Sequence, residues 1–512
     1  MANENSTFEI SITETLLPND GVCEEDQYTC LENSQKGSSN VCLQSESSVF
    51  GPIANLCSAT LGAGVLALPF AMSSAGICFG ILLLILAAAS TILSIDMLVQ
   101  SCAKLNLNSY EKLTVALFGN YMGWIVEGCI LTFCFGVCVA YIVAVGDILE
   151  QGVLGNLQNY QLPAFVTREF VMILFWAFVM FPLSLFEKIN ALRFASLFGV
   201  SSIFFLVFAV SYHSISSLSD HKHSALETYA SDTPEGSAIK YWPDSFVDVL
   251  RACPIILFAF NCQINVPAIL DELVHPSPPA QMKGITRGSI RICFFLYVVM
   301  GTLAYIEFRG KTQDNILKNY CVQVTHDPLM IMAFCSITLS VVLAFPLNIF
   351  PSRITLDIMI TRSFEQIFSQ KNTLSPHDLL EDPLISAHEE DSNSQSITNA
   401  PQQQQSIQRK VKHFVLTLVI SGLALIVAII VPDISVVFGL LGGFASSLTG
   451  LIMPAAFFLK LGLAEGNTRK KLKAWTLVVG GAIIGLLSTG VTIESMFHVQ
   501  DKQDVCTNMS VY

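Results

Sequence analysis

The fold is decided by the stretch Asn55-Leu-Cys-Ser-Ala-Thr-Leu-Gly62-Ala63-Gly64-Val-Leu-Ala-Leu-Pro69, an apolar run with features that ordinary membrane helices avoid. Gly62 and Gly64 are poor helix formers, and Pro69 has no N–H to donate to the preceding turn. Polar side chains stand just before the glycines. This pattern predicts a helix that is interrupted at its glycines.

The chain around this stretch is strongly apolar, since 52% of its 512 residues are apolar and only 13% are charged. A bilayer core of roughly 30 Å needs about 20 apolar residues per helix. This composition excludes a soluble enzyme, and only helices or closed barrels can span lipid. We predict an all-α integral membrane protein whose eleven transmembrane helices lie at about 50–74, 78–102, 121–150, 167–184, 190–212, 247–271, 287–308, 328–361, 413–431, 434–459 and 474–494.

The acidic charge of the chain is confined to two segments. Residues 1–48 hold nine acids and one base, and residues 371–408 hold six acids and one base. The rest of the chain is balanced, so no nucleic-acid partner is indicated. We expect a disordered acidic cytosolic tail at 1–48, a transmembrane domain formed by 49–365 and 410–495, a disordered cytosolic loop at 366–409, and a short outer or lumenal tail at 496–512.

The distribution of basic residues sets the expected orientation. The first apolar run begins near residue 50 behind the acidic tail, which does not fit a cleavable signal peptide. With the N-terminus in the cytosol, 19 of the 27 Lys and Arg residues fall inside and eight outside. Cys321 and Cys506 then lie outside, where they could form a disulfide. The outer loop 213–246 carries three histidines, expected to be ordinary solvated residues: His213, His221 and His223.

A second apolar run is interrupted like the first. It reads Ala252-Cys-Pro254-Ile-Ile-Leu-Phe-Ala-Phe-Asn261-Cys-Gln263-Ile-Asn265-Val-Pro267 and forms the sixth predicted span. The bland interpretation is two kinked helices whose polar side chains pack against neighbours. However, spans one and six are equivalent if spans 1–5 and 6–10 are inverted repeats, and matched interruptions of this kind indicate a transporter site. Free N–H groups there suit a carboxylate, and free carbonyls suit an ammonium group or a metal ion.

Motifs on four helices carry a family resemblance. The stretch from Asn55 to Pro69 resembles the first-helix motif of the amino acid/auxin permease family, closest to its sodium-coupled neutral amino acid transporters and their vacuolar relatives. Similar motifs of that family are matched by Phe181-Pro-Leu-Ser-Leu with Leu192-Arg-Phe-Ala-Ser, by Phe258-Ala-Phe-Asn-Cys-Gln with Val266-Pro-Ala-Ile-Leu-Asp-Glu-Leu273, and by Phe345-Pro-Leu-Asn-Ile-Phe-Pro-Ser-Arg353.

The resemblance implies a fold, an activity and a set of site residues. The fold would be a LeuT-type 5+5 inverted repeat with one added helix, and the activity secondary transport of amino acids. Helix one would offer backbone groups to the substrate and helix six would line it. The substrate-binding residues implied are Gly62, Ala63, Gly64, Phe260, Asn261 and Cys262.

The sodium pattern of that family is incomplete in this chain. The resemblance places Ser58 where the sodium-coupled branch has an Asn, and Val342 and Ala344 where it has two threonines. Sodium needs several hard oxygen ligands, so the departure favours H⁺ over Na⁺ as the coupling ion. The ion-coupling candidates are Asn55, Ser58, Ser340 and Glu127. Glu127 would be an intramembrane acid, unless it reaches water or pairs with Arg193.

Two further groups of residues are expected on either side of the site. Asp271 and Glu272, at the cytosolic end of span six, could form inner-gate ion pairs with Arg353 or nearby lysines. An outer vestibule that favours apolar or neutral substrates would be lined by Phe135, Tyr141, Phe258 and Phe260.

The sequence leaves two functions open. One is a secondary transporter of neutral amino acids that works by alternating access, because no charged residue marks the centre of spans one and six. The alternative is a non-transporting amino-acid sensor on the same fold. No cofactor, metal cluster or catalytic grouping is indicated, and the oligomeric state is open. A vacuolar or lysosomal membrane and the plasma membrane both remain as locations.

Overall fold

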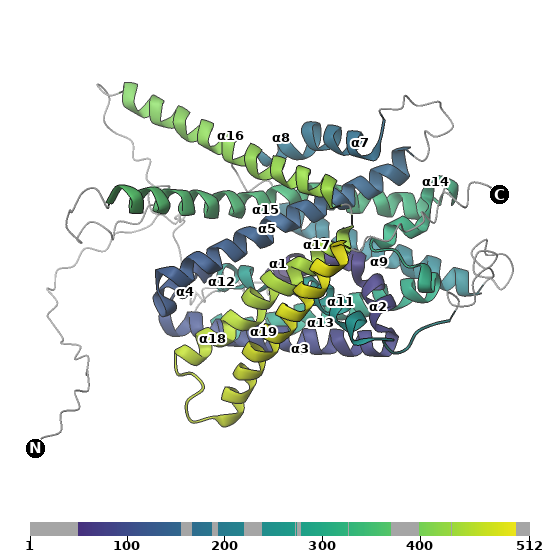
Figure 1. Cartoon of the computed structure of the whole chain (residues 1–512), viewed down its shortest axis with the longest axis horizontal. Helices are drawn as coiled ribbons and strands as arrows, with labels where there is room; N and C mark the ends of the chain where they lie inside the picture. The colour runs from purple at the N-terminus through teal and green to yellow at the C-terminus, as the bar shows by residue number, and fades with distance from the viewer. Residues whose placement is uncertain are drawn as a thin grey trace, which may run out of the picture. The chain divides into compact units, whose positions relative to one another are not determined.

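The computed structural model describes residues 50–154, 166–186, 193–219, 238–271, 273, 278–325, 327–369, 399–431 and 433–497. The chain divides into two units, Met1–Ser47 and Ser48–Tyr512, and all described residues belong to the second. The regular elements in these ranges are all helical (Figure 1). They are α1 (Phe50–Thr60), η1 (Ala63–Ala67), α2 (Leu68–Ala75), α3 (Ile77–Leu105), α4 (Tyr110–Phe118), α5 (Asn120–Leu149), η2 (Glu150–Leu154), α7 (Arg168–Phe175), η3 (Trp176–Met180), α8 (Phe181–Ser184), α9 (Arg193–Ser219), α11 (Phe246–Ala259), η5 (Gln263–Asn265), α12 (Val266–Asp271), α13 (Pro278–Phe308), η6 (Arg309–Lys311), η7 (Ile316–Tyr320), α14 (Val322–Thr325), α15 (Pro328–Ser369), α16 (Asn399–Ile430), α17 (Ile434–Leu440), η8 (Leu441–Ile452), α18 (Met453–Lys460) and α19 (Thr468–Phe497).

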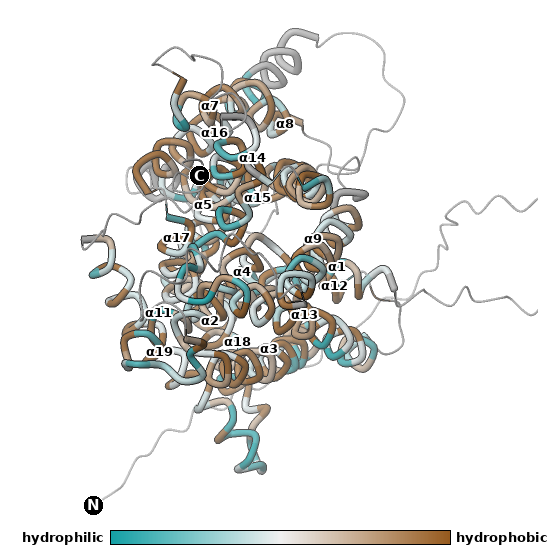
Figure 2. The backbone as a smooth tube through the Cα atoms, turned by 90° about the vertical axis from the view of Figure 1, so that its right-hand side faces the viewer, coloured by the Kyte–Doolittle hydropathy of each residue, from teal (hydrophilic) through white to brown (hydrophobic). Residues whose placement is uncertain are grey.

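Helices that are long and apolar enough to cross a membrane lie where the sequence predicts them. In the described part of the chain, nine helices are long and apolar enough to cross a membrane, and a bent pair, Gly51–Thr60 with Ala63–Ala75, makes a tenth if counted as one span. These correspond to ten of the eleven predicted segments. Figure 2 shows that the helices are predominantly hydrophobic. The chain is therefore a multi-pass helical membrane protein.

The remaining predicted segment, 167–184, is helical but does not reach the length of the other spans. It is formed by α7, the π-helical η3 and α8, which follow one another from Arg168 to Ser184. The stretches on either side, 155–165 and 187–192, lie outside the described residues. The count of eleven therefore stays a prediction.

Apolar packing brings the two interrupted spans together. Helix α13 packs against α1, α2, α3 and α9, while α11 packs against α2 and the π-helical η8. A second group of packed helices is formed by α5 and α15, which lie side by side (Figure 1), and by α16, which packs on both. Fully buried side chains such as Leu56, Leu66 and Phe345 belong to one continuous core. Between helices in a bilayer such packing is stabilised by van der Waals contact and interhelical hydrogen bonds, because lipid tails are as apolar as the side chains.

The helices bear on two expectations about loops, of which the disorder of residues 366–409 stays a prediction, because only the two ends of that segment are described. Helix α15 runs to Ser369 and α16 begins at Asn399, so helix extends into both ends of the segment 366–409 that was predicted to be disordered. Gln and Ala are good helix formers and prolong a helix that is already nucleated. His213 belongs to α9 and not to a loop, because α9 continues to Ser219. The other two loop histidines, the tail 1–48 and the segment 370–398 lie outside the described residues.

Candidate functional site

Span one is interrupted where the glycines predict it. Helix α1 ends at Thr60, and the next helical segment begins at Ala63 after a bend of 48°. The N–H of Leu61 still donates to the Cys57 carbonyl at 2.7 Å, whereas the N–H of Gly62 turns back to the Thr60 carbonyl at 3.0 Å. The N–H groups of Ala63 and Gly64 have no acceptor among the described residues. The break therefore offers two free donors at the start of the second half-helix.

Span six is interrupted in the same way. Helix α11 ends at Ala259, and η5 begins at Gln263. Within the break, the N–H of Asn261 donates to the Phe258 carbonyl at 3.0 Å, and the N–H of Cys262 donates to the side-chain Oε1 of Gln263 at 2.9 Å. Pro254 inside α11 and Pro267 in α12 remove further backbone donors near the break.

A tyrosine that the sequence did not single out holds the two breaks together. The hydroxyl of Tyr297 on α13 lies 2.7 Å from the Thr60 carbonyl and 2.8 Å from the Ala259 carbonyl. These are the last carbonyls of α1 and α11, where the regular hydrogen bonding of each helix ends; the Thr60 carbonyl also accepts from the Gly62 N–H at 3.0 Å. Tyr297 is fully buried, and its ring meets that of Phe260 edge to face at 5.1 Å. One side chain thus caps both half-helices.

The two glycines of span one have different surroundings. A Cβ atom at Gly64 would lie 3.2 Å from the Ala259 Cα and 3.2 Å from the Phe258 ring, so Gly64 allows spans one and six to approach closely. A Cβ at Gly62 would meet only the Tyr141 hydroxyl, at 3.9 Å. The space beside Gly62 is therefore open and faces a hydroxyl of span three.

The amide of Asn261 is the unusual polar group of the site. Its side chain is only 7% exposed, yet neither Nδ2 nor Oδ1 has a hydrogen-bond partner among the residues that the structure describes. Its neighbour Gln263, 1% exposed, is satisfied, because Gln263 donates to the Ser94 hydroxyl at 3.0 Å and accepts from the break backbone. A buried amide without a partner costs about 1–3 kcal/mol. Such a group is expected where a ligand supplies the missing partner.

A glycine of span ten makes room for these amides. A Cβ at Gly450 in η8 would lie 3.1 Å from Asn261 Oδ1 and 3.3 Å from Gln263 Oε1. Earlier in the same π-helical segment, a Cβ at Gly442 would lie 1.7 Å from the Pro254 carbonyl oxygen. Isolated π-helical turns are frequent at functional sites. Span ten therefore joins the site through small residues, which the sequence interpretation did not identify.

Aromatic rings surround the break of span six, as the composition of the predicted vestibule suggested. Phe258 stacks on Phe438 of α17 with ring centroids 4.5 Å apart, and Phe133 of α5 lies 5.8 Å from Phe258. The stack connects span six to span ten beside the break. These rings carry no charge, and neither do the amides and hydroxyls beside the two breaks.

The ion-coupling candidates are spread along several helices. Asn55 is exposed on α1 and Ser58 is half-buried, one turn closer to the break. Ser340 on α15 is 7% exposed and would lie 3.2 Å from a Cβ placed at Gly199 of α9. Its neighbour Val342, also buried, offers only an apolar side chain.

Glu127 is buried in α5 and has a partner other than Arg193. Its Oε1 accepts from a guanidinium nitrogen of Arg362 on α15 at 2.7 Å, and its Oε2 is buried without a hydrogen bond. The side chain of Arg193 is not described. The acid therefore links spans three and eight and lies away from the two breaks.

The predicted ion pair between Asp271 and Arg353 at an inner gate is not formed. Asp271 instead accepts from the Asn108 side chain at 2.5 Å, and Arg353 donates to the Thr417 hydroxyl at 3.1 Å. Each of the two charged side chains is therefore hydrogen-bonded to a neutral side chain and not to the other. The proposed partner Glu272 lies outside the described residues.

A buried ion cluster at the other end of the helices was not predicted. Asp147 of α5, 1% exposed, meets Arg168 at 2.8 Å and Lys318 of η7 at 3.3 Å. Lys318 also lies 3.3 Å from Asp314, whose second oxygen accepts from the Ile434 N–H at 2.9 Å. The cluster therefore ties span three, the segment between spans seven and eight, and the start of span ten.

Lys318 keeps its charge in this cluster. Burial by itself lowers the pKa of Lys318, but the carboxylates of Asp147 and Asp314 outweigh it and raise the pKa above its ordinary value. A raised lysine pKa contributes stability that is fully present below the unfolded value near 10.5 and is lost only as the pH rises through the folded value.

Cysteine and metal chemistry adds little to the site. Cys321 is disulfide-bonded, the ten other cysteines in the described ranges are free thiols, and Cys506 lies outside those ranges. The pairing of Cys321 with Cys506 stays a prediction. No group of three or more His, Cys, Asp or Glu side chains in the described part of the chain could hold a metal ion.

The fold is shared with solved transporters. Two mutant forms of the Eremococcus coleocola manganese transporter superpose with TM-scores of 0.53 and 0.51, at 14% and 15% identity. The first comparison covers 92% of this chain and 94% of that one, and the second covers 90% of each. At this identity the likeness concerns the fold alone, which is that of a LeuT-like transporter.

Comparisons of sequence identify the family. Residues 45–497 match the family described as transmembrane amino acid transporter protein, and the chain belongs to this family. Vacuolar amino acid transporter 5 of Schizosaccharomyces pombe is 24% identical, over 88% of this chain and 95% of that protein. Vacuolar amino acid transporter 6 of Saccharomyces cerevisiae is 27% identical over 82% and 92%. Sodium-coupled neutral amino acid transporter 7 of Danio rerio is 23% identical over 85% and 83%. The family and the names of these relatives are those of transporters.

Proposed function

We propose that the chain is a secondary transporter that moves neutral amino acids across a membrane by alternating access, with H⁺ as the coupling ion. The observation that carries this proposal is the amide of Asn261, which is buried in the break of span six beside Gly450 and has no hydrogen-bond partner among the described residues. The family and the names of its relatives support an amino acid as the substrate.

The two breaks suit the two charges of an amino acid. The free N–H groups of Ala63 and Gly64 lie at the start of a helical segment, where a carboxylate is stabilised. Carbonyl groups of the unwound turns, with the Asn261 Oδ1, suit the ammonium group. Phe260 and Cys262 complete the proposed lining, as the resemblance implies.

A neutral side chain fits the surroundings of the breaks. The groups beside them are aromatic rings, hydroxyls and amides, and burial of an unpaired substrate charge among them would be costly. A charged amino acid would need a counter-charge that these residues do not supply. Neutral amino acids are therefore the proposed class.

Proton coupling is proposed because the side chains that match the sodium pattern are incomplete. Val342 and Ala344 offer no side-chain oxygen, and Ser340 and Ser58 offer one hydroxyl each. The Danio rerio relative is named as sodium-coupled, so the choice needs a direct test. A proton gradient is available at an acidic organelle, and the names of the yeast relatives support a vacuolar membrane. The cytosolic N-terminus is proposed from the distribution of Lys and Arg along the sequence.

Alternating access is supported by contacts at one end of the helices. The Phe258–Phe438 stack and the cluster around Asp147 both join spans that would separate to admit substrate from the outer side. The structure then corresponds to a state that is closed on that side. Opening requires a change in the population of two states that the substrate binds with different affinity.

The direct test is uptake of radiolabelled glutamine and alanine by proteoliposomes that hold the full chain. We expect accumulation under an imposed pH gradient and none under a sodium gradient alone. Accumulation driven only by sodium would overturn the choice of ion. Binding without any uptake under either gradient would overturn the transporter and favour a sensor.

A further inference from the structure

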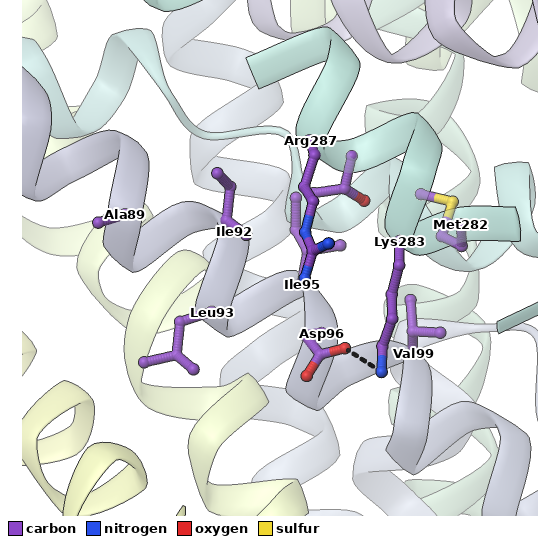
Figure 3. A pocket seen from close by; sticks show the side chains of 10 residues that line it. Ala89, Ile92, Leu93, Ile95, Asp96, Val99, Met282, Lys283 and Arg287 are labelled. Atoms are coloured by element: carbon purple, nitrogen blue, oxygen red, sulfur yellow. Dashed lines mark ion pairs between the residues drawn. The ribbon is translucent and has the colours of Figure 1, made fainter. Parts of the chain in front are cut away.

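A groove lies between the second and seventh spans, away from the interrupted helices. It is a cavity of about 200 Å³ between α3 and α13, and both helices line it. Figure 3 shows Lys283 and Arg287 extending from α13 towards α3, with Asp96 facing Lys283. The apolar part of the lining includes Ala89, Ile92 and Leu93 of α3.

The groove lies at the depth of a membrane–water boundary. Asp96 follows the start of α3 at Ile77 by 19 residues, or roughly 28 Å of helix at 1.5 Å per residue. The hydrocarbon core is roughly 30 Å thick, so Asp96 lies near the boundary opposite to Ile77. Leu93 and Ala89 lie about one and two turns deeper on the same helix and line the apolar part of the groove. By the predicted orientation this boundary is the cytosolic one.

The charged residues of the groove leave an excess of positive charge. Lys283 Nζ lies 3.4 Å from Asp96 Oδ1, so these two charges offset each other. Arg287 is exposed, and none of the ion pairs in the described part of the chain includes it. The guanidinium is a bidentate donor that matches phosphate oxygens.

A second donor in the groove also has no protein partner. Thr286 is 3% exposed and lines the groove, yet its buried Oγ1 makes no hydrogen bond. Threonine hydroxyls inside helices usually donate to a carbonyl one turn back, as Thr60 does to Leu56 at 2.7 Å. A buried hydroxyl and an exposed guanidinium on adjacent residues thus border the groove, the first without a hydrogen bond and the second without an ion pair among the described residues.

We propose that this groove binds an anionic phospholipid of the surrounding leaflet. The phosphate lies against Arg287 and the Thr286 hydroxyl, and an acyl chain runs along Ala89, Ile92 and Leu93 towards the membrane centre. A lipid fits better than a soluble anion because the groove continues into apolar surface at hydrocarbon depth. The inference requires only that the chain is embedded in a bilayer, and it does not depend on the transported substrate.

The test measures which lipid stays with the protein. The full chain is reconstituted in nanodiscs of equal parts dioleoylphosphatidylserine and dioleoylphosphatidylcholine, extracted gently, and its bound lipid is quantified by mass spectrometry. One cation at an anionic interface is worth about a fivefold preference, so we expect wild type to retain about five times more phosphatidylserine. Arg287→Gln should reduce this ratio to about one, and Thr286→Val should lower it.

Matched variants separate the groove from the general positive charge of this surface. Arg291 is exposed on α13 one turn beyond Arg287 and does not line the groove. Arg291→Gln should keep the wild-type ratio, and Arg287→Lys should restore part of it. Equal losses for Arg287→Gln and Arg291→Gln would overturn the site. Displacement of the lipid by inorganic phosphate alone would show that the groove binds a soluble anion and would overturn the lipid assignment.

Discussion

At the scale of single residues, the two glycines of span one perform different tasks. Gly64 allows close packing, because its Cα lies against Ala259 and Phe258, whereas Gly62 borders open space in front of Tyr141. Gly62 also has an extended backbone, with φ −108° and ψ −159°, which an alanine can adopt. Gly64 is therefore required for packing, and Gly62 borders the proposed ligand site.

Substitution by alanine should separate these tasks. Gly64→Ala should lower the free energy of unfolding by about 1–3 kcal/mol, because a methyl group is forced into a filled contact. Gly62→Ala should leave thermal stability unchanged and raise KM for the substrate, because its methyl group occupies the proposed site. Thermal melts and uptake kinetics of both variants provide the check. An unaltered KM for Gly62→Ala, in stable protein, would move the substrate elsewhere.

The residues that sequence could and could not predict differ in the range of their interactions. Gly62, Gly64, Pro254 and Pro267 act on their own backbone, so the breaks in spans one and six could be predicted locally. Tyr297 is hydrogen-bonded to the carbonyls of Thr60 and Ala259, which lie 237 and 38 positions away in the sequence. Nothing local distinguishes such a residue from any other apolar-helix tyrosine. The same holds for the Glu127–Arg362 pair, whose members are 235 positions apart.

At the scale of helices, Tyr297 of α13 is the connection between the two interrupted spans. Tyr297→Phe removes the hydroxyl that the two carbonyls share and leaves the Ala259 carbonyl without a partner among the described residues, which should cost about 1–3 kcal/mol of stability. Because those carbonyls end α1 and α11, uptake should also fall. Tyr305→Phe is the control, since the buried Tyr305 hydroxyl on the same helix accepts only from the Lys240 N–H, at 2.9 Å. Equal effects of both variants on KM would contradict a special role for Tyr297.

The buried ion cluster around Asp147 should control how readily the start of span ten separates from its neighbours. Lys318→Ala removes the cation between Asp147 and Asp314 and leaves Asp147 with less compensation. We expect amide hydrogen exchange at the start of α17 to rise about tenfold or more, because removal of one partner of a buried ion pair is strongly destabilising. Arg251→Ala is the control, since Arg251 pairs only with Asp248 at 4.0 Å. An unchanged exchange rate in Lys318→Ala would remove the cluster from the opening step.

The same measurement has a defined pH dependence. Because the two carboxylates raise the pKa of Lys318 above its ordinary value despite burial, Lys318 stays charged across the acidic and neutral range. Wild-type protection of α17 should therefore not weaken through Lys318 between about pH 5 and pH 8, after correction for intrinsic exchange. A loss of protection that tracks Lys318 within this range would contradict the cluster's assigned charge state.

At the scale of the whole molecule, the proposed coupling to protons requires a titratable group, and Glu127 is the candidate. It joins α5 to α15 through Arg362 and keeps one buried oxygen without a partner. Glu127→Gln should abolish accumulation driven by a pH gradient while substrate exchange without a gradient continues. Asp357→Asn, which loosens another pairing of α15, with Lys412, is the control. A wild-type pH response in Glu127→Gln would exclude this acid from coupling.

The arrangement of the whole molecule follows from the sequence more fully than its gates do. Long apolar runs predict spans because a bilayer allows few alternatives, and ten of the eleven are found with span character. The hydrogen bonds of Asp271 with Asn108 and of Arg353 with Thr417 were not predicted. Polar side chains at the ends of helices have many candidate partners at similar free-energy cost. Specific pairings there depend on tertiary packing that no local pattern contains.

The central claim is that substrate binds at the two breaks through the buried amide of Asn261, and one comparison tests it most directly. Uptake kinetics and thermal melts are measured for Asn261→Ala and for Asn265→Ala, whose side chain is exposed four residues farther on. Loss of hydrogen bonds to a charged substrate group should raise KM about tenfold to a hundredfold in Asn261→Ala. Its melting temperature should not fall, because the amide has no protein partner to lose. An unchanged KM with a lowered melting temperature would show a structural amide and contradict the site.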